Sequence, residues 1–393
     1  MSASRICKRC IATALLSLAS ATAIAATSTA TRPQLTSDQA STYTITNVLA
    51  KAGPIDALVT DHWNPTAGVA LLGADYTVAA DGSTRYRSVQ SAIDAAVAAG
   101  GTTRRYIGIK AGTYTELVCV PGNAPPLTLF GLGNSTGDTI IRFNNANPTP
   151  KQAGIPSHPC ASNASATKVG TFNSATFTVV AANFEARHLR VDNNYVEGTY
   201  GTNNQSAVAL AVRGDKASFE DILVTGNQDT LLISATSATD VIRAYFKSST
   251  IEGDTDFIFG SGVGVFDRAT IRSTGARLGS SSAGYVFAPS TRPGSRYGFL
   301  AINSRFIGVS GSPDNATYLG RAWDESVGTL SSYVNGTSPN GQVTVRDSIL
   351  GQHIHKNAPW AASTVSRPYC SSDCTNSANR FYEYNNSGAG AAD

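Results

Sequence analysis

The feature of this sequence that most constrains its fold is a repeat in the middle of the chain. Residues 219–229 and residues 246–256 share the pattern F-x4-[V/I]-x-G-x2-D, with an offset of 27 residues. Partial copies of the pattern begin at Phe184 and at Phe266. The matching Phe, β-branched, Gly and Asp positions favour a true repeat over chance similarity. Coils of roughly 20–30 residues with a phenylalanine in each are typical of a solenoid, whose stacked coils bury a column of like side chains.

Short β-rich runs follow one another from residue 106 onward, and Gly, Asn, Asp and Ser separate them. This pattern is typical of an all-β protein rather than of alternating strands and helices. A sandwich or a barrel would show similar runs, and the repeat favours a parallel solenoid over both. The runs cover residues 106–109, 127–130, 176–180, 208–212, 257–259, 297–302 and 343–349.

Two segments near the start of the chain have helical patterns. In residues 88–99 the apolar side chains recur with helical spacing, and the glycines at 100–101 end the pattern. Because the open end of a solenoid needs a cap, we expect this helix to cover the first coil. Thr36 and Gln39 form a capping-box pattern, which predicts a further helix through residues 40–49.

The first 25 residues have the pattern of a secretory signal peptide. Arg5, Lys8 and Arg9 precede a short apolar run, which ends in small residues at 23–25. A single membrane anchor is the alternative, but the run is short for one. Removal of this segment lowers the formal net charge from +3 to zero. A near-neutral chain has no long-range field for nucleic acid or for an anionic membrane.

Four cysteines remain after residue 25, and an even number in an oxidising compartment predicts two disulfides. Proximity alone favours the pairs Cys119–Cys160 and Cys370–Cys374. A zinc half-site at Cys370 and Cys374 is the alternative, but no histidine lies near them in the sequence.

The repeat also places two acidic residues together. If equivalent positions of consecutive coils stack, Asp229 and Asp256 lie on adjacent strands with backbones roughly 4.8 Å apart. Two carboxyl groups this close cannot both ionise freely, so the pair divides into an acid and a base or nucleophile. Gln228 can direct its amide NH2 group into the same space. Structural aspartates in turns are the alternative interpretation.

Other catalytic signatures are weak or missing in this sequence. It contains no G-x-S-x-G nucleophile elbow, no H-E-x-x-H zinc motif and no nucleotide-binding glycine motif in a strand–helix context. His353 and His355 fit two surface histidines better than a metal site. A retaining glycosidase would also need two carboxyl groups about 5 Å apart, whereas a purely binding solenoid would need no such pair.

Six short motifs follow one another along the chain. They are G-T-Y-T-E at 112–116, Q-S-A-V-A-L at 205–210, G-N-Q-D-T-L at 226–231, G-D-T-D-F-I-F-G at 253–260, L-G-R-A-W at 319–323 and the closing segment 380–390. In this order they resemble the motifs of the pectinesterase (pectin methylesterase) family, and the resemblance extends from about Tyr86 to the end of the chain. Each motif is short, and together they are specific.

The sequence departs from the family pattern at two places. Ala322 stands where the family has proline, beside Arg321 and Trp323. Residues 34–66 resemble a segment that some relatives carry after their solenoid, and here the segment comes first. The resemblance implies a right-handed parallel β-helix over residues 81–393, with residues 26–80 packed on its exterior.

The resemblance also implies roles in catalysis. Asp256 would be the nucleophile, and Asp229 would be the general acid and then the base. Arg321 beside Asp256 would keep that carboxylate charged. Gln228 would donate a hydrogen bond to the oxyanion. This chemistry needs no metal, nucleotide or flavin, so we expect no cofactor.

Further residues are implied as substrate contacts, namely Gln205, Thr176, Trp323 and Phe257, although a core position is the alternative for Phe257. The implied substrate is methyl-esterified homogalacturonan (pectin), cleaved to pectate and methanol by a secreted, monomeric enzyme. A pectin depolymerase and an ester or thioester hydrolase on the same fold remain alternatives, because a fold alone does not determine the substrate.

Overall fold

The computed structural model describes most of the chain after residue 25. The described residues are 26–54, 58, 60–71, 73–151, 157–161, 166–235, 237, 240–279, 284–369 and 379–393. The predicted signal peptide and the predicted Cys370–Cys374 bridge lie outside them. The predicted bridge between Cys119 and Cys160 is present, with Cα atoms 5.5 Å apart.

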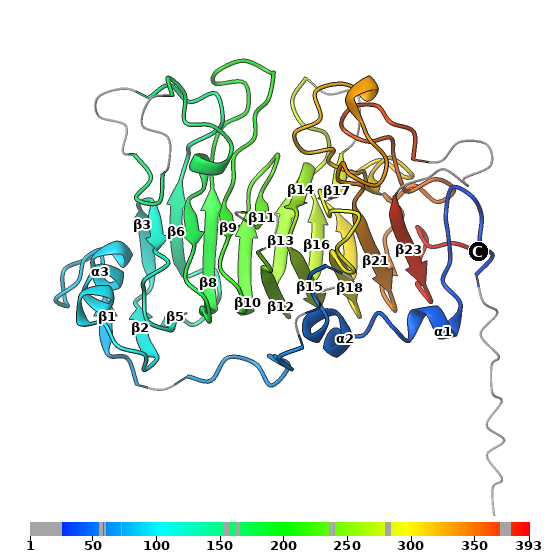
Figure 1. The fold of residues 1–393 in the computed structure, drawn as a ribbon. Helices are drawn as coiled ribbons and strands as arrows, with labels where there is room; N and C mark the ends of the chain where they lie inside the picture. Colours follow the sequence, from blue (N-terminus) through cyan, green and yellow to red (C-terminus); the bar gives the residue numbers. More distant parts are fainter. Residues whose placement is uncertain are drawn as a thin grey trace, which may run out of the picture.

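The strands coil into a parallel β-helix, as the repeat predicted (Figure 1). Each strand pairs in parallel with its counterpart one coil away. The first sheet has the order β1 (Tyr76–Val78), β2 (Arg105–Ile109), β5 (Leu127–Gly131), β8 (Glu185–Asn193), β10 (Ala217–Thr225), β12 (Arg243–Lys247), β15 (Val263–Asp267), β18 (Phe299–Ile302), β21 (Gln342–Arg346) and β23 (Arg380–Tyr384).

This sheet continues around a corner of each coil, and a second sheet closes the coil. The continuation contains β3 (Gly112–Thr115), β6 (Thr139–Phe143), β13 (Thr250–Gly253), β16 (Thr270–Ser273), β19 (Arg305–Gly308) and β22 (Ile349–Leu350). The second sheet contains β4 (Val118–Val120), β7 (Phe177–Val179), β9 (Leu210–Val212), β11 (Leu231–Ile233), β14 (Thr255–Gly260), β17 (Tyr285–Pro289) and β20 (Tyr318–Gly320).

The repeat sets the register of the central coils. Phe219 pairs with Phe246, and Phe246 pairs with Phe266, with ring centroids 4.6 and 5.3 Å apart. Phe184 differs from the predicted frame, because Ala186 is the residue that pairs with Phe219. A shift of two residues keeps a strand side chain on the same face. Phe184 therefore still contacts Phe219 inside the coil, with ring centroids 5.8 Å apart.

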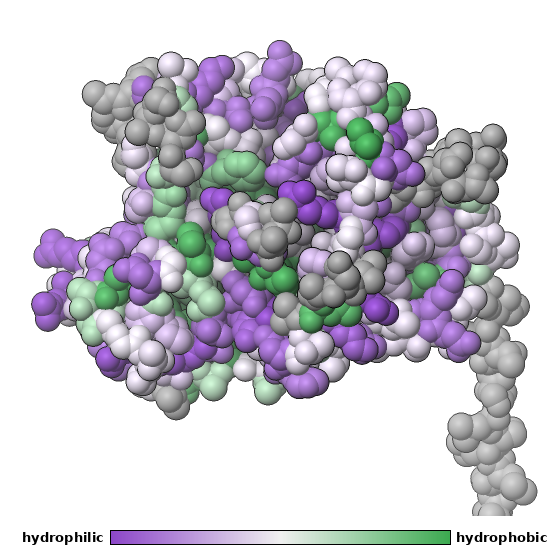
Figure 2. Space-filling model, viewed as in Figure 1, coloured by the Kyte–Doolittle hydropathy of each residue, from purple (hydrophilic) through white to green (hydrophobic). Residues whose placement is uncertain are grey.

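The core lies inside the coil. Ten phenylalanine side chains are less than 2% exposed, and burial of each contributes about 1.5–3 kcal/mol. On the face shown in Figure 2, hydrophobic residues lie in small separate groups among hydrophilic ones.

A single residue with left-handed backbone makes the corner between the two halves of the first sheet. The φ angles at this corner lie between 49° and 57° on seven successive coils. Aspartate and asparagine adopt this conformation more readily than most residues, which accounts for their frequency at the corner. The corner residues are His188, Asp221, Ser248, Arg268, Asn303, Asp347 and Asn385.

Helix α3 (Val89–Ala99) covers the first coil, which confirms the predicted cap (Figure 1). The hydroxyl of Ser88 accepts a hydrogen bond at the N-terminus of the helix. The carboxylate of Glu116 accepts hydrogen bonds from the backbone N–H groups of Val89 and Gln90, at 2.7 and 3.0 Å. A negative charge at this position also complements the helix dipole.

The predicted helix near residue 40 is divided into two. The capping box of Thr36 and Gln39 is present, but helix α1 (Ser37–Ala40) ends after one turn. Thr44 then caps a second helix, α2 (Ile45–Ala50). The described residues also include two short 3₁₀ helices, Phe172–Ser174 and Leu330–Ser332. Among the described helices, none has the length and apolar character needed to cross a membrane.

The N-terminal strap, defined as the described residues between 26 and 71, runs along the outside of the solenoid from its last coil to its first (Figure 1). Val48 and Leu49 pack against aromatic and aliphatic side chains on the outer face of the first sheet. The backbone N–H of Val69 donates to the carboxylate of Glu220 at 2.8 Å. The solenoid itself begins with β1, because Tyr76 pairs with Ile107 of β2.

Candidate active site

A cavity of about 540 Å³ lies on the outer surface of the second sheet, where β11, β14 and β17 are neighbours. Loops rise at both sides of these strands (Figure 1). The volume is in the ordinary range for a small-ligand pocket. The lining brings together five of the predicted site residues, namely Gln228, Asp229, Asp256, Arg321 and Trp323.

Asp229 and Asp256 lie at equivalent positions on adjacent coils. Leu231 pairs with Ile258, and the backbone N–H of Asp229 donates to the carbonyl of Thr255 at 3.0 Å. Both aspartates have left-handed backbone, with φ values of 64° and 51°. The pairing of β14 with β17 shifts register between residues 255 and 258. Such irregularities change the direction of a side chain, here toward the cavity.

Arg321 holds the Asp256 carboxylate through two parallel hydrogen bonds. Nε lies 2.9 Å from Oδ1, and Nη2 lies 2.6 Å from Oδ2. The guanidinium also lies over the ring of Tyr285, 4.0 Å from its centroid. Asp256 is 7% exposed, so the bidentate guanidinium is the main compensation for burying its charge.

Asp229 has no such partner. Burial, together with the negative charge of Asp256, raises the pKa of Asp229 to about 8. The side chain is therefore mainly protonated at neutral pH. The two neighbouring carboxyl groups thus differ in protonation state, because Arg321 pairs with Asp256 and not with Asp229.

The amide of Gln228 is oriented by two donors. Its Oε1 accepts from Nη1 of Arg277 at 2.8 Å and from the backbone N–H of Gln205 at 3.2 Å. Because both partners donate, the oxygen faces them and the NH2 group is directed elsewhere. Arg277 lines the cavity and was missed from the sequence, since it lies in a glycine- and serine-rich stretch without a pattern.

The other three predicted residues do not line the cavity. Gln205 is fully buried, where its side chain accepts from Gly198 N–H and donates to the Leu278 carbonyl. Thr176 is also fully buried, and its hydroxyl donates to the Asp192 carbonyl at 3.1 Å. Both side chains connect segments of the cavity wall.

Phe257 occupies the core, which was the alternative interpretation of this residue. Two residues later, Phe259 lines the cavity, and its ring centroid lies 5.7 Å from that of Trp323. The left-handed backbone of Asp256 and the register shift after Thr255 break the simple alternation of inward and outward side chains. The apolar face that the sequence placed at Phe257 is therefore supplied by Phe259.

Comparisons with known proteins identify the family of the chain. The sequence matches the pectinesterase family over residues 75–342. A pectinesterase of Ralstonia nicotianae is 59% identical over 386 residues, which cover 97% of each chain. The chain belongs to the pectinesterase family. It is therefore a carboxylic ester hydrolase.

Two further similarities describe the range of relatives of this pectinesterase. The solved structure of a rice weevil pectin methyl esterase has 35% identity and a TM-score of 0.78, over 92% of this chain and 98% of that chain. A putative acyl-CoA thioester hydrolase of Escherichia coli is 28% identical, over 92% of this chain and 89% of the relative.

Phe259 and Ala288 line the cavity of this pectinesterase and belong to an apolar row on the outer face of the second sheet. Leu232 pairs with Ala211 on one side and with Phe259 on the other, and Phe259 pairs with Ala288. Together with Trp323 at its end, the row forms an apolar cluster separate from the main core. An uncharged methyl ester and the apolar face of a sugar ring suit such a row.

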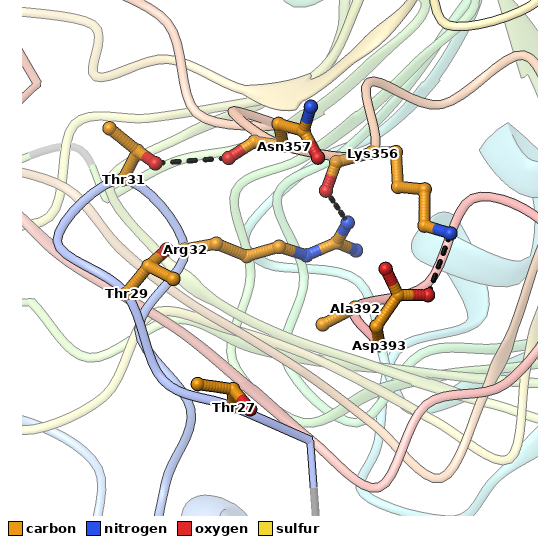
Figure 3. Close-up of a pocket in the computed structure, with 8 residues that line it drawn as sticks. All are labelled: Thr27, Thr29, Thr31, Arg32, Lys356, Asn357, Ala392 and Asp393. Atoms are coloured by element: carbon orange, nitrogen blue, oxygen red, sulfur yellow. Dashed lines mark hydrogen bonds and ion pairs between the residues drawn. The ribbon is translucent and has the colours of Figure 1, made fainter.

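A second cavity, of about 370 Å³, lies between the N-terminal strap and the end of the chain (Figure 3). Each of its charged side chains already has a partner of opposite charge. Arg32 pairs with Glu383 at 2.8 Å, and Lys356 pairs with Asp393 at 2.7 Å. The ion pairs around this second cavity fasten the strap to the last coil, and we call this region the joint. The first cavity instead holds Asp229 and Asp256, two carboxyl groups that differ in protonation state.

Proposed function

We propose that this protein is a secreted pectin methylesterase in which Asp256 is the nucleophile and Asp229 is the general acid and then the base. The proposal rests on one observation. Two carboxyl groups at equivalent positions of adjacent coils differ in protonation state. Arg321 pairs with Asp256 as a carboxylate, while Asp229 has a pKa near 8 and holds its proton at neutral pH. One cavity thus contains a nucleophile and a proton donor.

The reaction follows from these states. An Asp256 oxygen attacks the carbonyl carbon of a galacturonate methyl ester, and the C–O bond to methoxide breaks as Asp229 gives it a proton. Methanol leaves, and an acyl-enzyme anhydride remains on Asp256. Water then attacks the anhydride while the Asp229 carboxylate takes its proton. This step restores both aspartates and releases a free galacturonate carboxyl group.

The oxyanion of each tetrahedral intermediate needs a donor. The NH2 group of Gln228 is available, because Arg277 and the Gln205 backbone hold only its oxygen. Loss of one such donor typically lowers the rate by about 10²–10³-fold.

The apolar row and Trp323 would contact sugar rings of a polymeric, methyl-esterified homogalacturonan. The zero net charge after residue 25 favours this substrate over nucleic acid or an anionic membrane. We also infer a monomer that acts outside the cell after removal of residues 1–25.

The test is methanol release from highly methylated pectin, together with the chain length of the product. The wild type should release methanol without shortening the polymer, and Asp256→Asn should lose at least about 10³-fold in kcat. Asp347→Asn is a matched control, because asparagine already occupies the same corner at Asn303 and Asn385. Near wild-type turnover in Asp256→Asn would overturn the proposed nucleophile.

A thioester hydrolase is the second candidate, and the similarity to the Escherichia coli protein favours it. A substrate panel of methylated pectin and acyl-CoA thioesters separates the two. A higher kcat/KM for an acyl-CoA would replace the proposed substrate but leave the roles of the two aspartates in place.

A further inference from the structure

Two buried carboxylate oxygens near the catalytic pair have no hydrogen-bond donor among the described residues. They are Oε1 of Glu197 and Oδ1 of Asp254. The two side chains are hydrogen-bonding neighbours of each other. Asp254 is 3% exposed and lies two residues before Asp256. Glu197 comes from the loop between β8 and β9, which also carries the cavity residues Asn204 and Ser206.

Two ionised carboxylates cannot form a hydrogen bond, because both only accept. Two negative charges side by side would also be unfavourable, because Asp254 and the Oε1 atom of the half-buried Glu197 are both out of contact with water. A single proton between them removes both problems, since a carboxylic acid donates a strong hydrogen bond to a carboxylate. We infer that Glu197 and Asp254 share one proton, and that this bond holds the 194–205 loop in the position that orients Gln228.

The surroundings of the pair support a retained proton. Burial, followed by the charge of Glu197, raises the pKa of Asp254 to about 7. Asp229, on the preceding coil, is a further acidic group whose charge interacts with that of Asp254. Tyr195, in the same loop, is a further titratable group that interacts with Glu197. The hydrogen bond that Glu197 accepts from the Leu278 N–H comes from a neutral donor, and within the described residues no ion pair reaches either carboxyl.

The loop connects to the catalytic amide in three steps. Oε2 of Glu197 accepts from the Leu278 N–H at 2.9 Å. Gln205 donates to the Leu278 carbonyl at 2.9 Å and accepts from Gly198 N–H. The residue before Leu278 is Arg277, whose Nη1 holds the Gln228 oxygen at 2.8 Å. Movement of the loop therefore changes the direction of the Gln228 NH2 group.

The pH dependence has a definite sign. The pKa of Asp254 is about 7 in the structure, and opening of the loop, which removes Glu197 and admits water, would return it toward its ordinary value of 3.8. The closed state thus binds more protons between these values, so closure weakens as pH rises through this range. The expected change is about tenfold per pH unit, and it levels off above about pH 7.

Hydrogen exchange of the full-length protein tests this inference. The opening constant of residues 194–205, corrected for the intrinsic pH dependence of amide exchange, should rise about 50-fold between pH 5 and pH 7 in the wild type. Asp254→Asn replaces the shared proton with a permanent N–H donor, so its opening constant should not change with pH. Equal pH dependence in the variant and the wild type would overturn the inference.

Glu197→Gln gives the same prediction independently, should Asp254→Asn fold poorly. The link to Gln228 rests on the proposed function, and kcat/KM for methanol release reports it. Between pH 5 and pH 7, kcat/KM of Glu197→Gln should fall less than that of the wild type. The exchange measurement needs no activity, so it separates failure of the shared proton from failure of the proposed mechanism.

Discussion

Two arginine–carboxylate pairs of nearly equal geometry lie in two different regions of this molecule. Arg32 holds Glu383 at the joint between the strap and the last coil, with contacts of 2.9 and 2.8 Å. Arg321 holds Asp256 in the cavity, with contacts of 2.9 and 2.6 Å. Their side-chain exposures are 3% and 1% at the joint, and 22% and 9% in the cavity.

The difference lies in what else each pair contacts. At the joint, Arg32 also donates to the carbonyls of Gly390 and Lys356, and Glu383 accepts from Asn386. In the cavity, Asp229 brings a second carboxyl group, while both side-chain hydrogen bonds that Arg321 donates within the described part of the chain go to Asp256. An ion pair whose groups make further hydrogen bonds, as at the joint, stabilises the structure. An ion pair that lies beside a protonated carboxyl group, as in the cavity, leaves that proton available for catalysis.

The largest effect should come from breaking the cavity pair. Arg321→Leu leaves Asp256 buried without its cation, beside Asp229, so the nucleophile would bind a proton. Removing one partner of a buried pair costs about 3–5 kcal/mol, which corresponds to a loss of about 10²–10³-fold or more in kcat/KM for methanol release. Retention of wild-type kcat/KM would show that the pair does not hold the nucleophile.

Breaking the joint pair should act on stability instead. Arg32→Leu is expected to lower the free energy of unfolding by about 3–5 kcal/mol in urea titrations. The kcat of the folded fraction should not change, because the joint is remote from the cavity. The double variant Arg32→Leu/Glu383→Leu should recover much of the loss, since no buried charge remains unpaired. A double variant no more stable than the single one would contradict this account.

Asp229→Asn should abolish catalysis and raise stability in a pH-dependent manner. The pKa of Asp229 is about 8 in the folded protein and 3.8 ordinarily. The folded state therefore binds the extra proton between these values, and wild-type stability falls as pH rises from about 4 to 8. The asparagine variant avoids this loss. Its Tm relative to wild type should be about 5 °C higher at pH 8 than at pH 5.

The smallest effect is expected at the exposed rim of the joint. Lys356 and Asp393 form an ion pair with side-chain exposures of 42% and 89%. Exposed pairs contribute about 0–1 kcal/mol. Lys356→Met should therefore change the free energy of unfolding by less than about 1 kcal/mol. A loss as large as that of Arg32→Leu would mean that exposure does not distinguish the two pairs of the joint.

The solenoid and the carboxyl pair were predictable because both depend on the repeat. An equal spacing of Phe219 and Phe246, and of Asp229 and Asp256, determines which residues stack in a parallel coil. The capping helix was predictable for a similar reason, since its apolar spacing is local to residues 88–99.

The remaining features depend on contacts that no local pattern encodes. The irregular backbone at Asp256 decides that Phe259 rather than Phe257 lines the cavity. Arg277 reaches Gln228 from a loop without periodicity. The path of the strap depends on pairs such as Arg32–Glu383, whose members are 351 residues apart in the sequence.

The strap brings the two ends of the described chain together, since the backbone N–H of Thr27 donates to the Asp393 carbonyl at 3.0 Å. During synthesis Arg32 emerges long before Glu383, so the first residues of the strap can dock only after the last coil has been made. Until then these residues lack their buried partner, although Val48 and Leu49 can already pack on earlier coils.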